Sequence, residues 1–180
     1  MKAFSQIAVL CLAAVACGRT VVPRDLATIT ESLGHVQDKI DVLDTAVKAF
    51  NGDAGPVREG AENLVNTINT ESSSVQASEP LNKQDTASLL APVNNLKAHA
   101  KDLSNDFKAH RADVAAAKQC DETRQQLHNI LTATTHFINI IVGKVDHDYK
   151  GIAEEQANEI VKILQDILAY FGPDQCRNAA

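Results

Sequence analysis

The sequence contains few of the residues on which β-proteins and aromatic cores depend. It has no Trp, one Met and an aromatic share of only 4% in 180 residues, with 8 Gly and 5 Pro. So few turn-forming residues argue against an all-β fold, which needs many tight turns. The apolar share is nevertheless 44%, so Ala, Val, Leu and Ile must supply nearly all of the core. This composition favours a globular all-α protein.

Positive charge is also scarce. The chain has 17 Lys and Arg against 23 Asp and Glu, a formal net charge of −6. Sequence-independent nucleic-acid binding depends on basic residues that neutralise phosphates, so the charge argues against it and disfavours binding to anionic membrane surfaces. No segment beyond the N-terminal region offers the roughly 18 uninterrupted apolar residues of a transmembrane helix. We therefore expect a protein that does not span a membrane.

The first residues have the pattern of a secretory signal peptide. A basic residue precedes an apolar run over 7–16 that ends in small residues and is too short to span a bilayer. We expect residues 1–16 to be removed and the protein to be secreted, with a further cut after Arg24 as an option. Alternatively, Cys17 is a bacterial lipoprotein cysteine, although such sites usually carry Leu three residues earlier, where this chain has Ala14.

The four cysteines reduce to one pair. Cys11 lies in the signal peptide and Cys17 at its cleavage site, which leaves Cys120 and Cys176 together in an oxidising compartment. We predict a disulfide between them. A nucleophilic cysteine needs a His partner, and neither cysteine has one nearby in the sequence, so a catalytic role is the weaker interpretation.

Apolar residues recur every three or four positions in five segments, which predicts five amphipathic helices. The segments cover about 26–50, 56–75, 89–114, 121–142 and 146–171. Pro92 either kinks the third helix or marks its start, and the third and fourth helices meet near Gln119 and Cys120 without an intervening Pro or Gly. Short connections make consecutive helices antiparallel. The predicted fold is a five-helix antiparallel bundle over 25–172, followed by a tail over 173–180.

Sequence patterns of known catalytic and metal sites are missing. No Glu has a His three residues later, as a di-iron bundle requires, and no two His stand four apart as in helical zinc sites. Asp146, His147 and Asp148 form the densest ligand-like cluster, but at a helix start such residues more often act as caps. A Gly-rich phosphate loop and a Gly-x-Ser-x-Gly elbow are also missing. We therefore predict no enzyme, no metal site and no cofactor.

The fourth helix is apolar over more of its circumference than a bundle seam requires. Ile138, Ile140, Ile141 and Val142 surround Phe137 on several faces. Two interpretations remain open. Either these residues are packed core, or they line a long apolar cavity between the helices, where bundles usually hold their ligands.

The chain resembles a family of fungal proteins. Pro92 and Val93 with Leu96 and Leu103, the Lys-Val-Asp turn over 144–146 and the amphipathic last helix ending at 167–171 are similar to hydrophobic surface binding protein A. That family includes the cell-wall galactomannoproteins. The resemblance implies a secreted five-helix domain that either adsorbs to hydrophobic surfaces or encloses fatty acids in a central cavity.

On this interpretation, aliphatic and Phe residues on the inward faces of the helices would contact the acyl chain. A fatty-acid carboxylate would need a hydrogen-bond donor or water at the cavity mouth, and Ser72, Thr134 and Thr135 are the candidates, unless their hydroxyls bond back to their own helix. The cavity candidates are Leu33, Val36, Ile40, Leu64, Ile68, Leu103, Phe107, Leu131, Phe137, Ile138, Ile141, Ile163 and Ile167.

The sequence thus supports two main functional hypotheses. In the first, the protein is a secreted or cell-wall lipid-binding protein that holds long-chain fatty acids in the bundle. In the second, it is a surface-active adaptor that adsorbs to hydrophobic surfaces and recruits a secreted hydrolase. A purely structural role in the cell wall is neither supported nor excluded by any feature of the sequence.

Overall fold

The computed structural model describes residues 24–179, so the predicted signal peptide lies outside the described residues. The described chain is all-helical, which confirms the predicted fold class. Two short helices and a 3-10 helix occupy connections between the long ones. The long helices are α1 (Arg24–Lys48), α2 (Gly55–Gln76), α4 (Leu90–Ala109), α6 (Cys120–Lys144) and α7 (Lys150–Tyr170), and the short ones are α3 (Lys83–Ser88), α5 (Arg111–Ala116) and η1 (His147–Tyr149).

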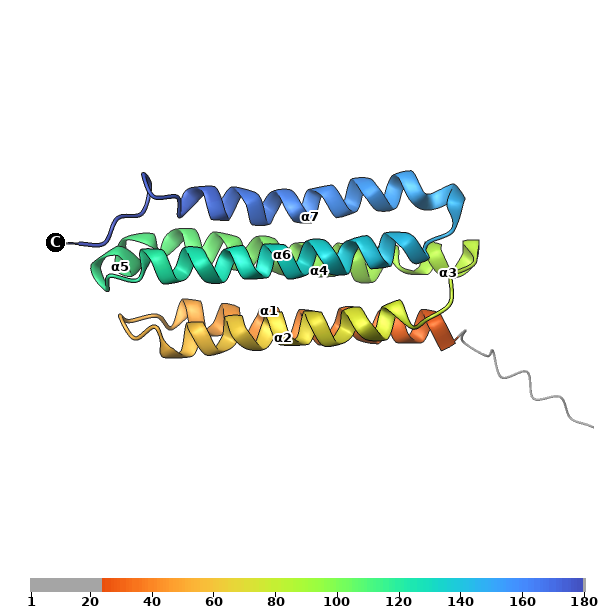
Figure 1. The fold of residues 1–180 in the computed structure, drawn as a ribbon, viewed down its shortest axis with the longest axis horizontal. Helices are drawn as coiled ribbons and strands as arrows, with labels where there is room; N and C mark the ends of the chain where they lie inside the picture. The colour runs from red at the N-terminus through yellow and green to blue at the C-terminus, as the bar shows by residue number, and fades with distance from the viewer. Residues whose placement is uncertain (1–23, 180) are drawn as a thin grey trace, which may run out of the picture.

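The long helices run alternately in opposite directions and form three layers (Figure 1). α1 and α2 make one outer layer, α4 and α6 the middle layer, and α7 alone the other outer layer. Around the bundle axis, α1 packs on α2 and α4, α2 packs on α6, and α7 packs on both α6 and α4. The five helices therefore form a ring, and α7 is the single helix that closes it over α4 and α6.

Local sequence signals explain the helix boundaries. Pro56 lies in the first turn of α2, and Pro92 in the first turn of α4, where a missing N–H is tolerated. Pro92 therefore marks the start of α4 and does not kink it. The predicted boundary at Gln119 and Cys120 is also correct, because α6 begins at Cys120. The predicted third helix is interrupted once, at His110, which separates α4 from α5.

The two ends of the bundle differ in how they are closed. At the end where α5, the start of α6 and the C-terminal tail meet, Cys120 and Cys176 form a disulfide with a Cα–Cα distance of 5.6 Å, as predicted. We call this the disulfide end. The opposite end, formed by α3, η1, the start of α4 and the start of α7, is called the α3 end. The N-terminus of α1 lies at the α3 end (Figure 1).

The core follows the apolar stripes that define the helices. It is a single cluster of buried side chains, mostly Leu, Ile and Val, that extends from Ile29 near the start of α1 to Phe171 after α7. In the described part of the chain, no helix combines the length and the apolarity needed to cross a membrane.

Candidate functional site

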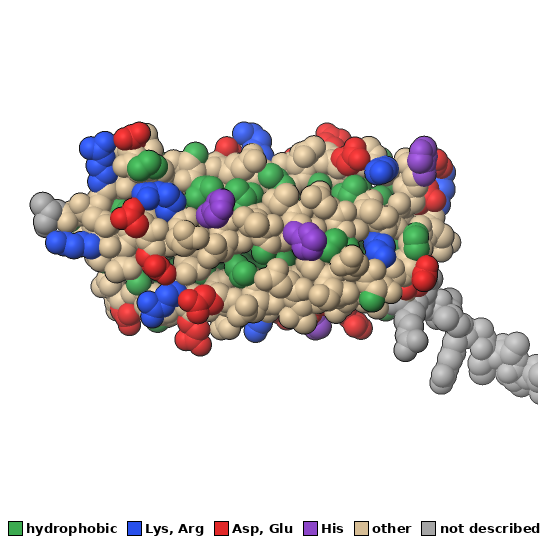
Figure 2. Space-filling view, viewed as in Figure 1, with side chains coloured by type: hydrophobic (Ala, Val, Ile, Leu, Met, Phe, Trp, Pro, Cys, Tyr) green, Lys and Arg blue, Asp and Glu red, His purple; other side chains and the backbone are tan. Residues whose placement is uncertain are grey.

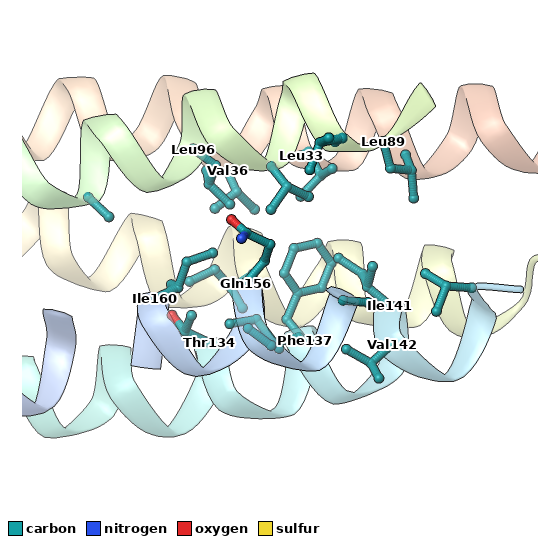
Figure 3. A pocket seen from close by; sticks show the side chains of 18 of the residues that line it. Leu33, Val36, Leu89, Leu96, Thr134, Phe137, Ile141, Val142, Gln156 and Ile160 are labelled. Carbon is teal, nitrogen blue, oxygen red and sulfur yellow. The ribbon is translucent and has the colours of Figure 1, made fainter. Parts of the chain in front are cut away.

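An apolar cavity of about 370 Å³ lies within the ring of helices, and every long helix contributes to its wall. The side chains of the wall point inward from opposite sides of the bundle (Figure 3). The lining residues are Leu33, Val36 and Ile40 of α1; Leu64 and Ile68 of α2; Thr86 and Ala87 of α3; Leu89; Leu90, Val93, Leu96, Ala100 and Leu103 of α4; Ile130, Thr134, Phe137, Ile138, Ile141 and Val142 of α6; Val145; Tyr149 of η1; and Ile152, Ala153, Gln156, Ala157, Ile160 and Leu164 of α7.

The cavity exists because the inward side chains are too small to fill the ring. Phe137 and Tyr149 are the only aromatic residues in the wall, and Ala100, Ala153 and Ala157 occupy positions where α4 and α7 face the axis. Protein interiors are normally as densely packed as organic crystals, so a space of this size is unusual in a small domain. The apolar wall would exclude charged or strongly polar guests and accept hydrocarbon.

The cavity is elongated along the bundle. On α4 its wall extends from Leu90 to Leu103, a rise of roughly 20 Å at 1.5 Å per residue. One end of the wall reaches the surface, because Leu90 and Ile152 are 48% and 50% exposed. Both residues lie at the α3 end, at the starts of α4 and α7. The α3 end is therefore one place where the apolar wall meets solvent.

Polar groups in the wall are few, and none of the lining residues that the structure describes is charged. Thr86 already accepts a hydrogen bond through Oγ1 from the backbone N–H of Asp146, at 3.0 Å. Gln156 accepts one through Oε1 from the Lys97 ammonium, at 2.6 Å. Thr134 and Tyr149 contribute hydroxyl groups. A bound molecule would thus meet polar groups at only a few positions in a hydrocarbon wall.

Polar contacts hold the α3 end together. Lys83 of α3 contacts Asp148 of η1 at 2.8 Å, and this contact lowers the pKa of the Asp148 carboxyl and raises the pKa of Lys83. Asp146 caps η1 by accepting from the backbone N–H of Asp148. The cluster 146–148 therefore has the capping role that sequence reasoning favoured over metal binding. In the described residues, no three His, Cys, Asp or Glu side chains come together as a metal site.

Nine of the thirteen cavity candidates from the sequence are part of the wall, and four lie outside it. Phe107 and Ile167 are buried, 3% and 2% exposed, one turn beyond the last lining residues toward the disulfide end. Leu131 and Ile163 are half-buried next to the lining residues Ile130 and Leu164. One residue along a helix turns the side chain by about 100°, enough to take these two out of the wall.

Of the three candidate carboxylate contacts, one is part of the cavity wall and two are not. The Ser72 hydroxyl donates to the backbone oxygen of Ile68, and the Thr135 hydroxyl to that of Leu131, both at 2.7 Å. Both thus bond back to their own helices, which is the alternative that the sequence left open. Neither is part of the wall, whereas Thr134 is.

Sequence reasoning missed Gln156, the one amide in the wall. A signal for it is present, because Gln156 stands four residues from both Ile152 and Ile160 on the apolar stripe of the last helix. A polar residue at such a position faces the interior and needs a reason to be there.

Known proteins resemble this chain in sequence and in fold. Cell wall mannoprotein 1 of Aspergillus flavus is 26% identical over 163 residues, which cover 90% of this chain and 60% of that protein. The chain thus spans about 60% of the length of this curated relative.

Solved structures share the fold at low identity. Ligand binding domain 1 of the Penicillium marneffei MP1 protein, complexed with arachidonic acids, has a TM-score of 0.80 at 13% identity, covering 83% of this chain and 99% of that domain. AFMP4P in complex with palmitic acid has a TM-score of 0.77 at 17% identity, covering 82% of this chain and 99% of that one. The sequence profile of one family, hydrophobic surface binding protein A, matches residues 26–143. The chain therefore belongs to the hydrophobic surface binding protein A family.

Proposed function

We propose that the protein binds long-chain fatty acids, or lipids with an acyl chain of similar length, in the cavity between its helices. The observation that carries this proposal is the cavity itself, about 370 Å³ in volume with a wall made almost entirely of aliphatic side chains. Its roughly 20 Å length along α4 is about that of an extended sixteen-carbon chain. The arachidonic and palmitic acid complexes of proteins with the same fold support the choice of ligand.

The energetics of burial are sufficient for useful affinity. Moving about 14 methylene groups out of water contributes roughly 11 kcal/mol at 0.8 kcal/mol each. Ordering the chain and losing its free translation and rotation offset several kcal/mol of this gain. Dissociation constants in the micromolar range or below are therefore expected.

The same observations support a binding role and not a catalytic one, in an extracellular setting. The family is described by surface binding, the curated relative is a cell wall protein and the solved neighbours are ligand-binding domains. A disulfide between Cys120 and Cys176 is typical of proteins that fold in an oxidising compartment. We infer a secreted protein of the cell wall or its surroundings.

A matched pair of variants tests the cavity as the binding site. Ala157 lines the cavity and Ala169 lies on the exposed face of the same helix. Ala157→Phe should fill the cavity and weaken palmitic acid binding by at least about tenfold, whereas Ala169→Phe should leave it unchanged. Native mass spectrometry and titration calorimetry give both results. A wild-type protein that carries no lipid from its host and takes up no added fatty acid would disprove the proposal.

Adsorption to hydrophobic surfaces is the second candidate, favoured by the family description and by exposed Leu90 and Ile152 at the α3 end. On the face shown in Figure 2, hydrophobic side chains are visible in small separate groups and do not form one continuous patch. We infer that adsorption would use the cavity wall, uncovered by movement of α7. If so, protein saturated with palmitic acid should adsorb less to a polystyrene surface than the lipid-free protein, and equal adsorption would argue against it. Recruitment of a secreted hydrolase would follow adsorption.

A further inference from the structure

A polar bridge joins α4 to α7 across the side of the cavity. The Lys97 ammonium on α4 donates to Gln156 Oε1 and to Glu159 Oε2 on α7, both at 2.6 Å. We call these three residues the α4–α7 bridge. The side chain of Lys97 is 25% exposed and that of Glu159 is 49% exposed, so the bridge lies at the boundary between the cavity wall and solvent.

The chemistry of the bridge fixes the orientation of the Gln156 amide. An ammonium group has only donors, so the Gln156 oxygen must face Lys97 and the Nε2 group must face away from it. Gln156 lines the cavity, and its amide end points across it toward Leu96 and Val36 (Figure 3). Within residues 24–179 no hydrogen bond from Gln156 Nε2 is formed. The bridge therefore presents unused N–H donors at an apolar wall.

We propose that the α4–α7 bridge is the site that holds the carboxylate of the bound fatty acid, and this inference rests on the proposed function. The carboxylate accepts hydrogen bonds from Gln156 Nε2–H and from the third N–H of the Lys97 ammonium. Because Lys97 lies near the middle of the wall on α4, which extends from Leu90 to Leu103, the acyl chain bends within the cavity. Two of the three Lys97 protons are already donated within the bridge, so one remains. The site selects free fatty acids over their neutral esters, because only the acid carries the charge that Lys97 compensates.

Other polar groups of the wall are less suited to an anion. The hydroxyls of Thr86, Thr134 and Tyr149 are neutral and offer one donor each. A carboxylate moved out of water needs a charged partner or several donors, or its desolvation offsets the gain from burying the acyl chain. Lys97 is bonded directly to a residue of the wall, and its partial exposure keeps the ligand's charged group near water.

The negative charge of Glu159 should weaken the binding of the acid. Its carboxylate already neutralises the Lys97 ammonium, so it repels the carboxylate of the ligand and competes with it for the positive charge, although one N–H of Lys97 stays free. Glu159 is half-exposed and can turn into solvent at little cost when the ligand binds. Removing its charge should therefore strengthen the binding of the acid and leave the binding of an ester unchanged.

The experiment compares palmitic acid with methyl palmitate by calorimetry or by displacement of a fluorescent fatty acid. Wild-type protein should prefer the acid by roughly tenfold or more, the range expected for charge-assisted hydrogen bonds. Lys97→Met should abolish this preference by weakening acid binding alone, Gln156→Leu should reduce it because one donor is lost, and Glu159→Gln should increase it a few-fold. Lys101→Met, an exposed position one turn along α4, is the matched control and should keep the wild-type preference.

Ester binding serves as the internal check on folding, because it requires the cavity but not the bridge. If Lys97→Met loses both ligands, Lys97→Arg decides, since it keeps the charge and should retain a preference for the acid. An unchanged preference in Lys97→Met and Gln156→Leu would overturn the proposal, and so would a preference abolished by Thr134→Val. Failure of the wild-type protein to bind either compound would instead disprove the proposed function.

Discussion

The disulfide end and the α3 end of the bundle are built from different side chains. Four of the six aromatic residues that the structure describes lie at the disulfide end: Phe50, Phe107, Tyr170 and Phe171. Phe107 and Phe171 meet edge to face with ring centroids 6.2 Å apart, and the void there measures only about 20 Å³. From the α3 end inward, aliphatic side chains surround a void of about 370 Å³. Placing the scarce rings at one end leaves the rest of the bundle with side chains too small to fill it.

The ends also differ in how their segments are tied together. At the disulfide end, Arg124 Nε donates to the Phe171 backbone oxygen at 2.9 Å, beside the covalent link. At the α3 end the described ties are the Lys83–Asp148 ion pair and hydrogen bonds, such as Leu81 N–H to the Lys144 oxygen at 2.7 Å and Glu79 N–H to Asp25 Oδ1 at 2.9 Å. We infer that the disulfide end anchors stability and that the α3 end opens to admit ligand.

Removing the disulfide should change the free energy of unfolding more than any other substitution discussed below. Replacing Cys120 and Cys176 by Ala frees a loop with a sequence separation of 56 and should lower the free energy of unfolding by about 4 kcal/mol in the chain-entropy model. Palmitic acid affinity should change less than threefold under conditions where the variant is folded. Urea unfolding and calorimetry measure the two quantities. A parallel loss of affinity would mean that the two ends are not independent.

Truncating one aromatic residue outside the cavity and one in its wall should separate effects on stability from effects on ligand binding. Phe171 is fully buried against Phe107, so Phe171→Ala should destabilise the protein by roughly 3 kcal/mol through the space it leaves. Phe137 is equally buried but lines the cavity, so Phe137→Ala should also enlarge the ligand site and shift preference toward bulkier acyl chains. Thermal unfolding and a series of fatty acids of increasing volume separate the two effects. A changed ligand preference in Phe171→Ala would contradict the assignment of that end.

The sequence predicts the helices well because their apolar stripes have a strict spacing. It also predicts the disulfide, because Cys120 and Cys176 are the two cysteines that lie outside the N-terminal region. It does not predict where the cavity ends. Phe107 and Leu103 belong to the same stripe, one turn apart. Leu103 lines the cavity, whereas Phe107 packs against Phe171 from the other end of the chain and lies outside it. The spacing of apolar residues shows which face of a helix points inward. Whether the space next to that face is filled depends on the side chains of the other helices, which the spacing does not reveal.

A partly buried carboxylate gives stability a pH dependence near the disulfide end. Burial and the neighbouring Asp106 carboxylate raise the pKa of Asp44, although Lys48 counteracts them, and Asp44 Oδ1 has no hydrogen-bond partner in the described chain. Because the folded protein holds this proton more tightly than the unfolded chain, its contribution is present below the ordinary Asp pKa of about 3.9 and is lost as the pH rises through the higher folded value.

Asp44→Asn should therefore stabilise the protein at neutral pH, by on the order of 0.5 kcal/mol, and not below pH 4. Urea unfolding of both proteins between pH 3 and 8 measures the difference. Lys48 is exposed, so losing its ionic partner should matter little. A gain that is the same at every pH would assign the effect to something other than the charge of Asp44.

The smallest expected effect concerns the turn that leads into the disulfide. α5 ends in a Schellman motif, with Gln119 N–H bonded to the Val114 oxygen and Lys118 N–H to the Ala115 oxygen. Lys118 occupies the position normally taken by Gly and has φ of 61°, a conformation that disfavours residues with a Cβ. Lys118 is exposed, so Lys118→Gly should relieve this strain with no loss of packing and stabilise the protein by about 0.5 kcal/mol after the extra entropy of Gly in the unfolded chain is subtracted. Lys118→Ala is the control and should give no such gain, because Ala retains the Cβ. The gain should appear in urea unfolding, while palmitic acid affinity should stay the same because the turn lies away from the cavity. A change in affinity would show that strain at this turn is transmitted along α6 to the cavity wall.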